Sequence, residues 1–186
     1  MADAHAPRGS DGAGGDWLVI VDPQVIFADP QNSPWGSAMW AGTVDHIARL
    51  AAASTPSRTI ITRFVADPSL GGSWRPYYEE WPFALVPGDD PLYAVVPELA
   101  DVAGHVVTAG TFGKWPVLRD LVGEGARLTL TGVSTDCCVL STALPAADAG
   151  ATVHIAAAGC AGSSEENHQR ALDAMSLYGP QITIID

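Results

Sequence analysis

The chain has 186 residues, which is enough for one compact domain with a substantial core and too few for two. Its formal net charge of -12 argues against nucleic acid as a partner, because nucleic-acid binders need a basic face to displace counterions from phosphates. No run approaches the roughly 20 apolar residues that span a bilayer, so no membrane partner is expected either.

Residues 1–15 are rich in Gly, Ala, Asp and Ser and carry no periodic apolar pattern. This composition predicts a disordered N-terminal tail, followed by one domain over residues 16–186. The tail lacks the apolar segment of a secretory signal, so we expect a cytoplasmic protein. Three cysteines do not make a disulfide framework, which favours reduced thiols and leaves a thiol nucleophile available.

Short apolar runs rich in β-formers then alternate with segments suited to helices. The runs are residues 17–22, 57–64, 104–109, 126–133, 151–158 and 181–186, and the helical segments are residues 43–53, 116–122, 136–149 and 164–178. Ser164 is suited to cap the last helix, because its side-chain oxygen can accept a hydrogen bond from a free backbone amide. The two glutamates that follow it favour the positive end of the helix. The alternation predicts an α/β fold: a single three-layer α/β/α domain with a six-stranded, mainly parallel, doubly wound sheet.

Residues 65–97 interrupt this alternation and are rich in Pro, Gly, Trp and Tyr. A long irregular insert in a compact domain is typically a binding loop or a lid. Aromatic residues at this density also suit an interface between subunits. We therefore expect either a substrate lid or an interface here, and a homodimer or higher homo-oligomer.

Three chemically useful groups follow strands of the predicted sheet. Asp22 ends the first strand, Lys114 follows the third and is the only lysine of the chain, and the stretch "GVSTDCC" follows the fourth. Ligands of open α/β sheets bind at the carboxyl ends of the strands. A carboxylate, an amine and a thiol are thus expected to converge in one cleft.

Of the adjacent pair Cys137 and Cys138, one is expected to face the cleft, because neighbours on a helix point about 100° apart. Helical spacing aligns Cys137 with Leu140, Ser141 and Leu144, a largely apolar stripe. It aligns Cys138 with Ser141 and Thr142, a small and polar stripe. This favours Cys138 as the exposed nucleophile and Cys137 as a packing residue. A thiol in the first turn of a helix is further expected to be stabilised as a thiolate.

The stretches "VDPQVIFADP" and "GVSTDCCVLSTA" together resemble the isochorismatase-like cysteine hydrolases, a family that includes nicotinamidases and N-carbamoylsarcosine amidohydrolase. The first motif is represented by Asp22, Gln24 and Phe27, and the Gly-x-x-Thr-Asp-x-Cys-Val signature by Gly132, Thr135, Asp136, Cys138 and Val139. The likeness continues through "AADAGATVHIAAAGCAGSSEENHQRALDAM", so it spans the chain from Trp17 onward. The register of the signature also selects Cys138.

The resemblance implies a hydrolase with an Asp-Lys-Cys type of catalytic triad. Cys138 would attack an amide-like carbonyl and form an acyl-enzyme, with Asp22 moving the proton and a lysine stabilising the charged site. Backbone amides of Ser134 and Cys138 would hold the oxyanion. The family positions these amides with a cis peptide bond, which is expected here between Val133 and Ser134.

The chain departs from the family pattern in the position of its lysine. In most members the lysine stands at the end of the third strand, near Thr108 or Ala109 here, whereas Lys114 comes several residues later. We predict that Lys114 reaches the site by a different loop path. Arg63, at the end of the second strand, is the alternative cation.

The residues that bind metal in nicotinamidase-like members are also missing. Residues 61–68 offer Asp67 without a neighbouring histidine, and the five histidines (His5, His46, His105, His154 and His168) show no ligand spacing. We expect no metal and no cofactor, which disfavours nicotinamide as the substrate. Cys160 is interpreted as a structural residue.

Phe27, Trp35, Trp81 and Arg63 are predicted to line the substrate pocket. The leading hypothesis is a hydrolase of a small amide, ureido or carbamoyl compound. Two alternatives stay open: cleavage of a vinyl ether as in isochorismatase, which does not need a thiol, and a non-catalytic binding or scaffold protein that has lost the full triad.

Overall fold

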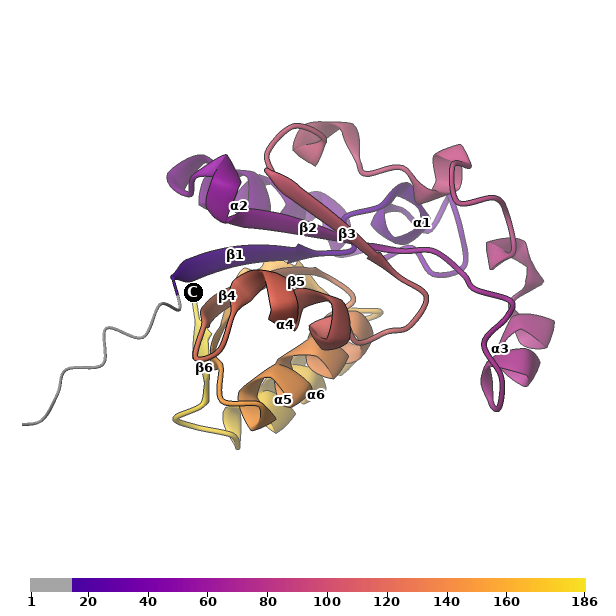
Figure 1. Cartoon of the computed structure of the whole chain (residues 1–186). Coiled ribbons are helices and arrows are strands. Elements are labelled where there is room, and N and C mark those ends of the chain that lie inside the picture. The colour runs from indigo at the N-terminus through magenta and orange to yellow at the C-terminus, as the bar shows by residue number, and fades with distance from the viewer. Residues whose placement is uncertain (1–14) are drawn as a thin grey trace, which may run out of the picture.

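The structure is a computed structural model that describes residues 15–186, and its centre is a six-stranded sheet (Figure 1). The strands are β1 (Asp16–Val21), β2 (Thr59–Phe64), β3 (His105–Ala109), β4 (Arg127–Val133), β5 (Thr152–Ala161) and β6 (Ile182–Ile185). Their order is β3-β2-β1-β4-β5-β6, and every pairing is parallel. The predicted α/β fold is thereby confirmed, with all six strands at the expected places.

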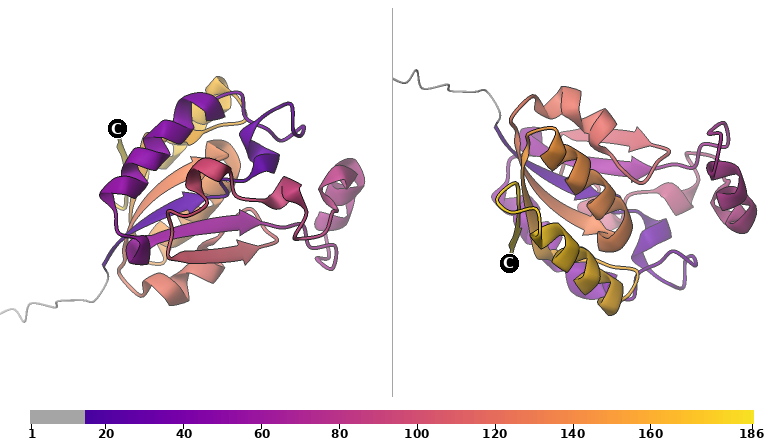
Figure 2. Two further views of the ribbon diagram at one scale, coloured as in Figure 1. Left: turned by 90° about the horizontal axis from the view of Figure 1, so that it is seen from above. Right: turned by 90° about the horizontal axis from the view of Figure 1, so that it is seen from below.

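Helices cover both faces of the sheet, as Figure 2 shows from above and below. The helices are α1 (Val25–Ala28), α2 (Trp40–Ala53), α3 (Trp74–Glu80), α4 (Trp115–Val122), α5 (Leu140–Asp148) and α6 (Glu165–Ser176). Alternate residues of β1 point to opposite faces. Val19 packs in a core with α4, α5 and α6, whereas Ile20 packs in a second core with α1 and α2.

The insert is more ordered than its composition predicts. It contains α3 and short 3₁₀ helices at Pro82–Ala84 and Pro91–Tyr93, each of which begins with a proline. Proline suits the first position of a helix, where its missing N–H leaves no hydrogen bond unmade. The prediction of irregular structure overlooked this role of proline. In Figure 1 α3 lies beyond the carboxyl ends of the strands, which is where a lid would lie.

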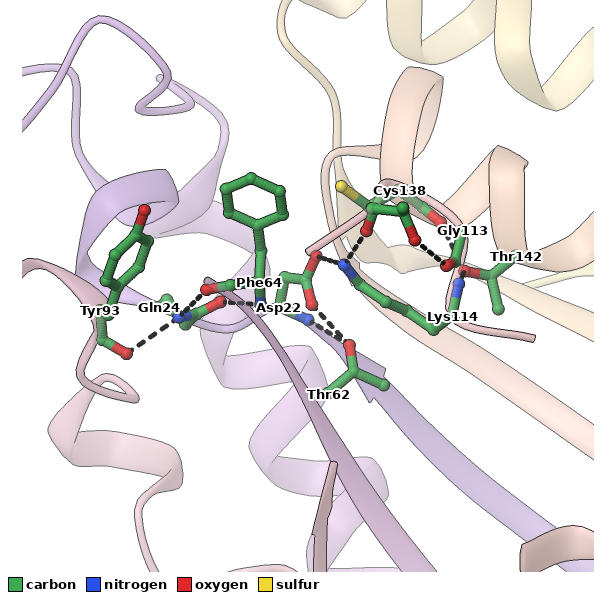
Figure 3. Close-up of polar contacts among 10 residues, drawn as sticks. Asp22, Gln24, Thr62, Phe64, Tyr93, Gly113, Lys114, Cys138 and Thr142 are labelled. Carbon is green, nitrogen blue, oxygen red and sulfur yellow. Dashed lines mark hydrogen bonds and ion pairs between the residues drawn. The ribbon is translucent and has the colours of Figure 1, made fainter. Parts of the chain in front are cut away.

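Gln24 ties the insert to the sheet through three buried hydrogen bonds. Its Nε2 donates to the carbonyls of Phe64 and Tyr93, each at 2.9 Å, and its Oε1 accepts from the Phe64 amide at 2.7 Å (Figure 3). Phe64 ends β2, whereas Tyr93 belongs to the insert, so the Gln24 side chain bridges the two. The side chain therefore replaces the backbone pairing that β2 loses where the chain leaves the sheet.

Replacing Gln24 by leucine is expected to lower the free energy of unfolding by roughly 3 kcal/mol, because buried peptide groups of Phe64 and Tyr93 lose their partner. Urea denaturation measures the loss. Gln31→Leu is the matched control, since Gln31 is exposed and donates only its backbone amide, to Asp29. Equal stability of the two variants would contradict the anchoring role.

No helix in residues 15–186 has the length and apolar character that a bilayer crossing requires. The predicted disordered tail lies, except for Gly15, outside the described residues and stays a prediction. His5 lies outside them as well.

Candidate active site

Asp22 follows β1 directly and lies at the topological switch point of the sheet, between the ends of β2 and β4. Its φ of 47° is in the left-handed region that non-glycine residues seldom adopt. Thr62 holds the residue at both ends: the Asp22 amide donates to the Thr62 hydroxyl at 3.1 Å, and that hydroxyl donates to Asp22 Oδ1 at 2.6 Å. The carboxylate is fully buried.

The Lys114 ammonium lies 3.0 Å from Asp22 Oδ2, and both side chains are 0% exposed. Lys114 Nζ also donates to the Thr111 carbonyl at 2.6 Å. No other described residue donates a hydrogen bond to Oδ2. Figure 3 shows the lysine side chain pointing toward the carboxylate. Oδ1 already accepts a hydrogen bond from the Thr62 hydroxyl. Oδ2, which Lys114 contacts, is therefore the oxygen able to take up a proton.

The loop after β3 explains how the displaced lysine reaches the site. The Lys114 amide donates to the Thr142 hydroxyl at 2.9 Å, and that hydroxyl donates to the Cys138 carbonyl at 2.7 Å. A Cβ on Gly113 would lie 2.6 Å from the Ser141 carbonyl oxygen, so only glycine allows the loop to lie this close to α5. The predicted alternative loop path is thus present.

Cys138 lies on the turn that follows β4. Gly132 pairs with Val21 at the strand end and has a φ of 109°, and a Cβ there would lie 2.1 Å from the Val21 carbonyl oxygen. Glycine is therefore required for the close approach that sets Asp22 beside the cysteine turn. The expected cis peptide bond between Val133 and Ser134 is present.

Regular helical spacing predicts that Cys138 is the more exposed of the two cysteines, and this prediction is wrong. Residues Thr135–Val139 form a π-helical turn, in which the Val139 amide donates to the Ser134 carbonyl five residues back. The wider turn invalidates a spacing of 100° per residue. Cys138 is 4% exposed and part of the core, whereas Cys137 is half-buried, and both line the same cavity.

The electrostatics of the two thiols also differ from the thiolate expectation. A hydrogen bond to Cys137, burial and the Asp22 carboxylate raise the pKa of Cys138 well above its ordinary value, while the Lys114 ammonium lowers it. The hydrogen bond to Cys138 lowers the pKa of Cys137 despite burial. The hydrogen bond to Cys137, burial and the neighbouring carboxylate thus outweigh the helix start and raise the pKa of Cys138, so its proton needs a base during attack.

A cavity of about 300 Å³ opens beside the thiols. It is lined by Phe27, Pro34, Trp35, Gly36, Phe64, Tyr77, Trp81, Phe112, Ser134, Cys137, Cys138 and Ser163. Its size suits a small molecule, and its wall is mainly aromatic. The two residues whose amides were assigned to the oxyanion, Ser134 and Cys138, both lie in this wall.

The predicted pocket residues Phe27, Trp35 and Trp81 line the cavity, but the assignment of Arg63 to it is wrong. The Arg63 guanidinium donates to the carbonyls of Gly88 at 2.9 Å and Tyr93 at 3.2 Å, so it is tied to the insert. Nor does it act as the alternative cation, because Lys114 holds the place beside Asp22.

Phe64, Phe112 and Ser163 also line the cavity but are not among the pocket residues predicted from the sequence. Phe64 is the last residue of a buried strand, Phe112 belongs to the loop of the displaced lysine, and Ser163 follows β5. The rule that ligands collect at strand carboxyl ends would have included Phe64 and Ser163.

The residues considered as metal ligands do not lie together in the described part of the chain. Within residues 15–186, no group of three or more His, Cys, Asp or Glu side chains is placed to hold a metal ion. Asp67 instead accepts hydrogen bonds from Ser69, and His168 Nδ1 lies 2.8 Å from the Thr135 hydroxyl. Cys160 is buried, and burial raises its pKa to about 12, in keeping with a structural role.

Comparison with protein families matches residues 16–186 to the model of the isochorismatase domain. A curated relative, isochorismatase domain-containing protein 2 of Rattus norvegicus, is 33% identical over 91 residues. That match covers 47% of this chain and 43% of the relative, so it spans less than half of the relative's length.

Solved structures share the fold at low sequence identity. A cysteine hydrolase from Pseudomonas syringae superposes with a TM-score of 0.75 at 19% identity, covering 91% of this chain and 88% of that one. A pyrazinamidase/nicotinamidase from Streptococcus mutans superposes with a TM-score of 0.70 at 22% identity, covering 91% and 99%.

Proposed function

Because the chain belongs to the isochorismatase family, whose structural relatives include cysteine hydrolases, we propose that it hydrolyses a small amide, ureido or carbamoyl compound through an acyl-enzyme on Cys138. One observation carries the proposal: the fully buried Asp22–Lys114 ion pair beside Cys138, next to an apolar cavity. A buried ion pair costs desolvation free energy, so such a pair next to a thiol supports a chemical role.

In the proposed reaction Asp22 takes the proton of the Cys138 thiol while the sulfur attacks the carbonyl carbon. A C–S bond forms, and the carbonyl electron pair moves to oxygen. When the C–N bond breaks, Asp22 returns the proton to the leaving amine. Water then attacks the thioester with Asp22 again as the base, which releases the acid and restores the thiol.

Lys114 stabilises the charges of this cycle. Its ammonium lowers the pKa of Cys138 and pairs with Asp22, so it favours both the Cys138 thiolate and the Asp22 carboxylate. The tetrahedral oxyanion would be held by the amides of Ser134 and Cys138, two residues of the cavity wall. Such donors typically contribute about 10²-fold or more to kcat.

The two alternatives lose support from this geometry. The non-catalytic interpretation rested on the displaced lysine, and Lys114 lies at ion-pair distance from Asp22. Vinyl-ether cleavage as in isochorismatase does not require a thiol nucleophile, whereas Cys138 lies close enough to the Asp22 carboxylate for that charge to raise its pKa.

Ammonia release from a panel of small amides, ureido compounds and carbamoyl compounds tests the proposal. We expect saturable release from at least one class, and none from a vinyl ether of similar size. A folded protein that releases no ammonia from any member of the panel would support the non-catalytic interpretation instead.

A further inference from the structure

Building on the proposed function, we infer that the substrate is an uncharged carboxamide with a flat, apolar acyl group, and that the site rejects amides that carry a carboxylate. The shape and polarity of the cavity narrow the substrate class in this way. Three properties of the described residues carry the inference: an aromatic wall, the absence of an available cation, and an anion behind the two serine hydroxyls of the wall.

The aromatic wall is organised around Trp35. Its ring stacks on Phe27, with centroids 6.0 Å apart and an interplanar angle of 9°, and on Tyr77, at 5.8 Å and 26°. It meets Phe64 edge to face at 5.9 Å. Rings locked against one another present a rigid apolar surface, which complements the face or edge of a planar apolar group.

The basic side chains near the cavity are either bound to other groups of the protein or lie outside the cavity lining. Lys114 is fully buried against Asp22 and Thr111, and Arg63 is bound to backbone carbonyls of the insert. Arg75 lies on the outer side of α3, by a different hollow of the surface. The lining of the cavity, as described, contains no Lys, Arg or His side chain. A substrate carboxylate would therefore lose its hydration without gaining a counter-charge.

Asp136 makes the wall still less suitable for an anion. The hydroxyls of Ser134 and Ser163 both donate to its carboxylate, at 2.7 Å each, and the Ser163 amide donates at 2.8 Å. Burial opposes ionisation, but these hydrogen bonds outweigh it and lower the pKa of Asp136. The two serines are thus oriented toward an anion behind the wall and are not free to bind a second one.

A cationic acyl group is disfavoured as well. The Lys114 ammonium lies 5.3 Å from the centroid of the Phe64 ring, so this aromatic wall already interacts with a cation. A second positive charge in the cavity would lose its hydration without gaining an available carboxylate, because Asp22 is paired with Lys114 and Asp136 lies behind two serines that donate to it. The uncharged amide is the one class that meets no unfavourable group.

Three benzamides of similar shape test the inference: 4-methylbenzamide, 4-carbamoylbenzoate and 4-(trimethylammonio)benzamide. We expect kcat/KM for the methyl compound to exceed that of both charged compounds by about 100-fold, as for a site that must bury an unpaired charge. A carboxylate or trimethylammonium compound that is hydrolysed as well as the methyl compound would overturn the inference.

Binding to the Cys138→Ser variant, measured by calorimetry, separates this inference from the proposed function. If the wild-type protein hydrolyses none of the three while the variant binds the methyl compound at least tenfold more tightly than the others, the proposed function fails and the inference holds. Failure of the methyl compound to bind, or tighter binding of a charged compound, overturns the inference whatever the activity.

A variant with an added cation gives a second test. Trp81→Arg places a guanidinium in the wall, and Leu85→Arg adds the same charge at an exposed position of the insert outside the cavity. Trp81→Arg should shift the ratio of binding constants at least tenfold toward 4-carbamoylbenzoate, and Leu85→Arg should not. An equal shift in both variants would show that net charge, not the wall, excludes anions, which contradicts the inference.

Discussion

Replacing Cys138 by alanine is expected to lower kcat for amide hydrolysis by roughly 10³-fold or more, because the acyl-enzyme cannot form without the sulfur. The thiol is 4% exposed, and its pKa is shifted by both charges of the buried Asp22–Lys114 pair. Steady-state kinetics of ammonia release measure the effect. Circular dichroism checks that the variant is folded.

Cys137→Ala is the matched control, since it removes the same atoms from the neighbouring residue in the same cavity. Cys137 shares a hydrogen bond with Cys138, so its loss changes the pKa of the nucleophile and is expected to lower kcat by less than about tenfold. A larger loss in Cys137→Ala than in Cys138→Ala would reverse the assignment of the nucleophile.

Lys114→Met should cost about 3–5 kcal/mol of the free energy of unfolding, in addition to activity. The substitution leaves the Asp22 carboxylate fully buried with no ammonium within reach, and an uncompensated buried charge is among the most destabilising defects in a protein. Thr62 still donates one hydrogen bond to this carboxylate, which sets the loss toward the lower end. Urea denaturation at neutral pH measures it.

The double variant Asp22→Asn/Lys114→Met separates stability from chemistry. It removes both charges, so most of the lost stability should return, while hydrolysis should stay abolished because no base remains. Recovery of activity together with stability would show that the pair is structural. A stable but inactive double variant is the result that the proposed mechanism requires.

The sheet and the position of Asp22 could be predicted from the sequence because they follow from local patterns. Apolar runs bounded by turns identified all six strands, and the rule of strand carboxyl ends selected Asp22. The Ser164 cap follows the same logic: its hydroxyl accepts from the Asn167 amide at 3.1 Å.

The remainder of the site depends on contacts between distant segments, which local patterns do not encode. Lys114 reaches Asp22 because Gly113 lets its loop lie on α5, a contact between residues that are far apart in the chain. The π-helical turn displaced both cysteines from the positions that regular helical spacing assigns to them. Arg63 was misassigned because its carbonyl partners belong to the insert, whose path is not visible in the sequence.

In the proposed mechanism, Cys138 carries the acyl group during turnover. Its most direct test is mass spectrometry of the acid-quenched reaction with 4-methylbenzamide, followed by fragmentation between Cys137 and Cys138. We expect a mass increase equal to the 4-methylbenzoyl group, located on Cys138 and absent from the Cys138→Ala variant. An adduct on Cys137, or ammonia release without any adduct under conditions where hydrolysis of the thioester limits the rate, would contradict it.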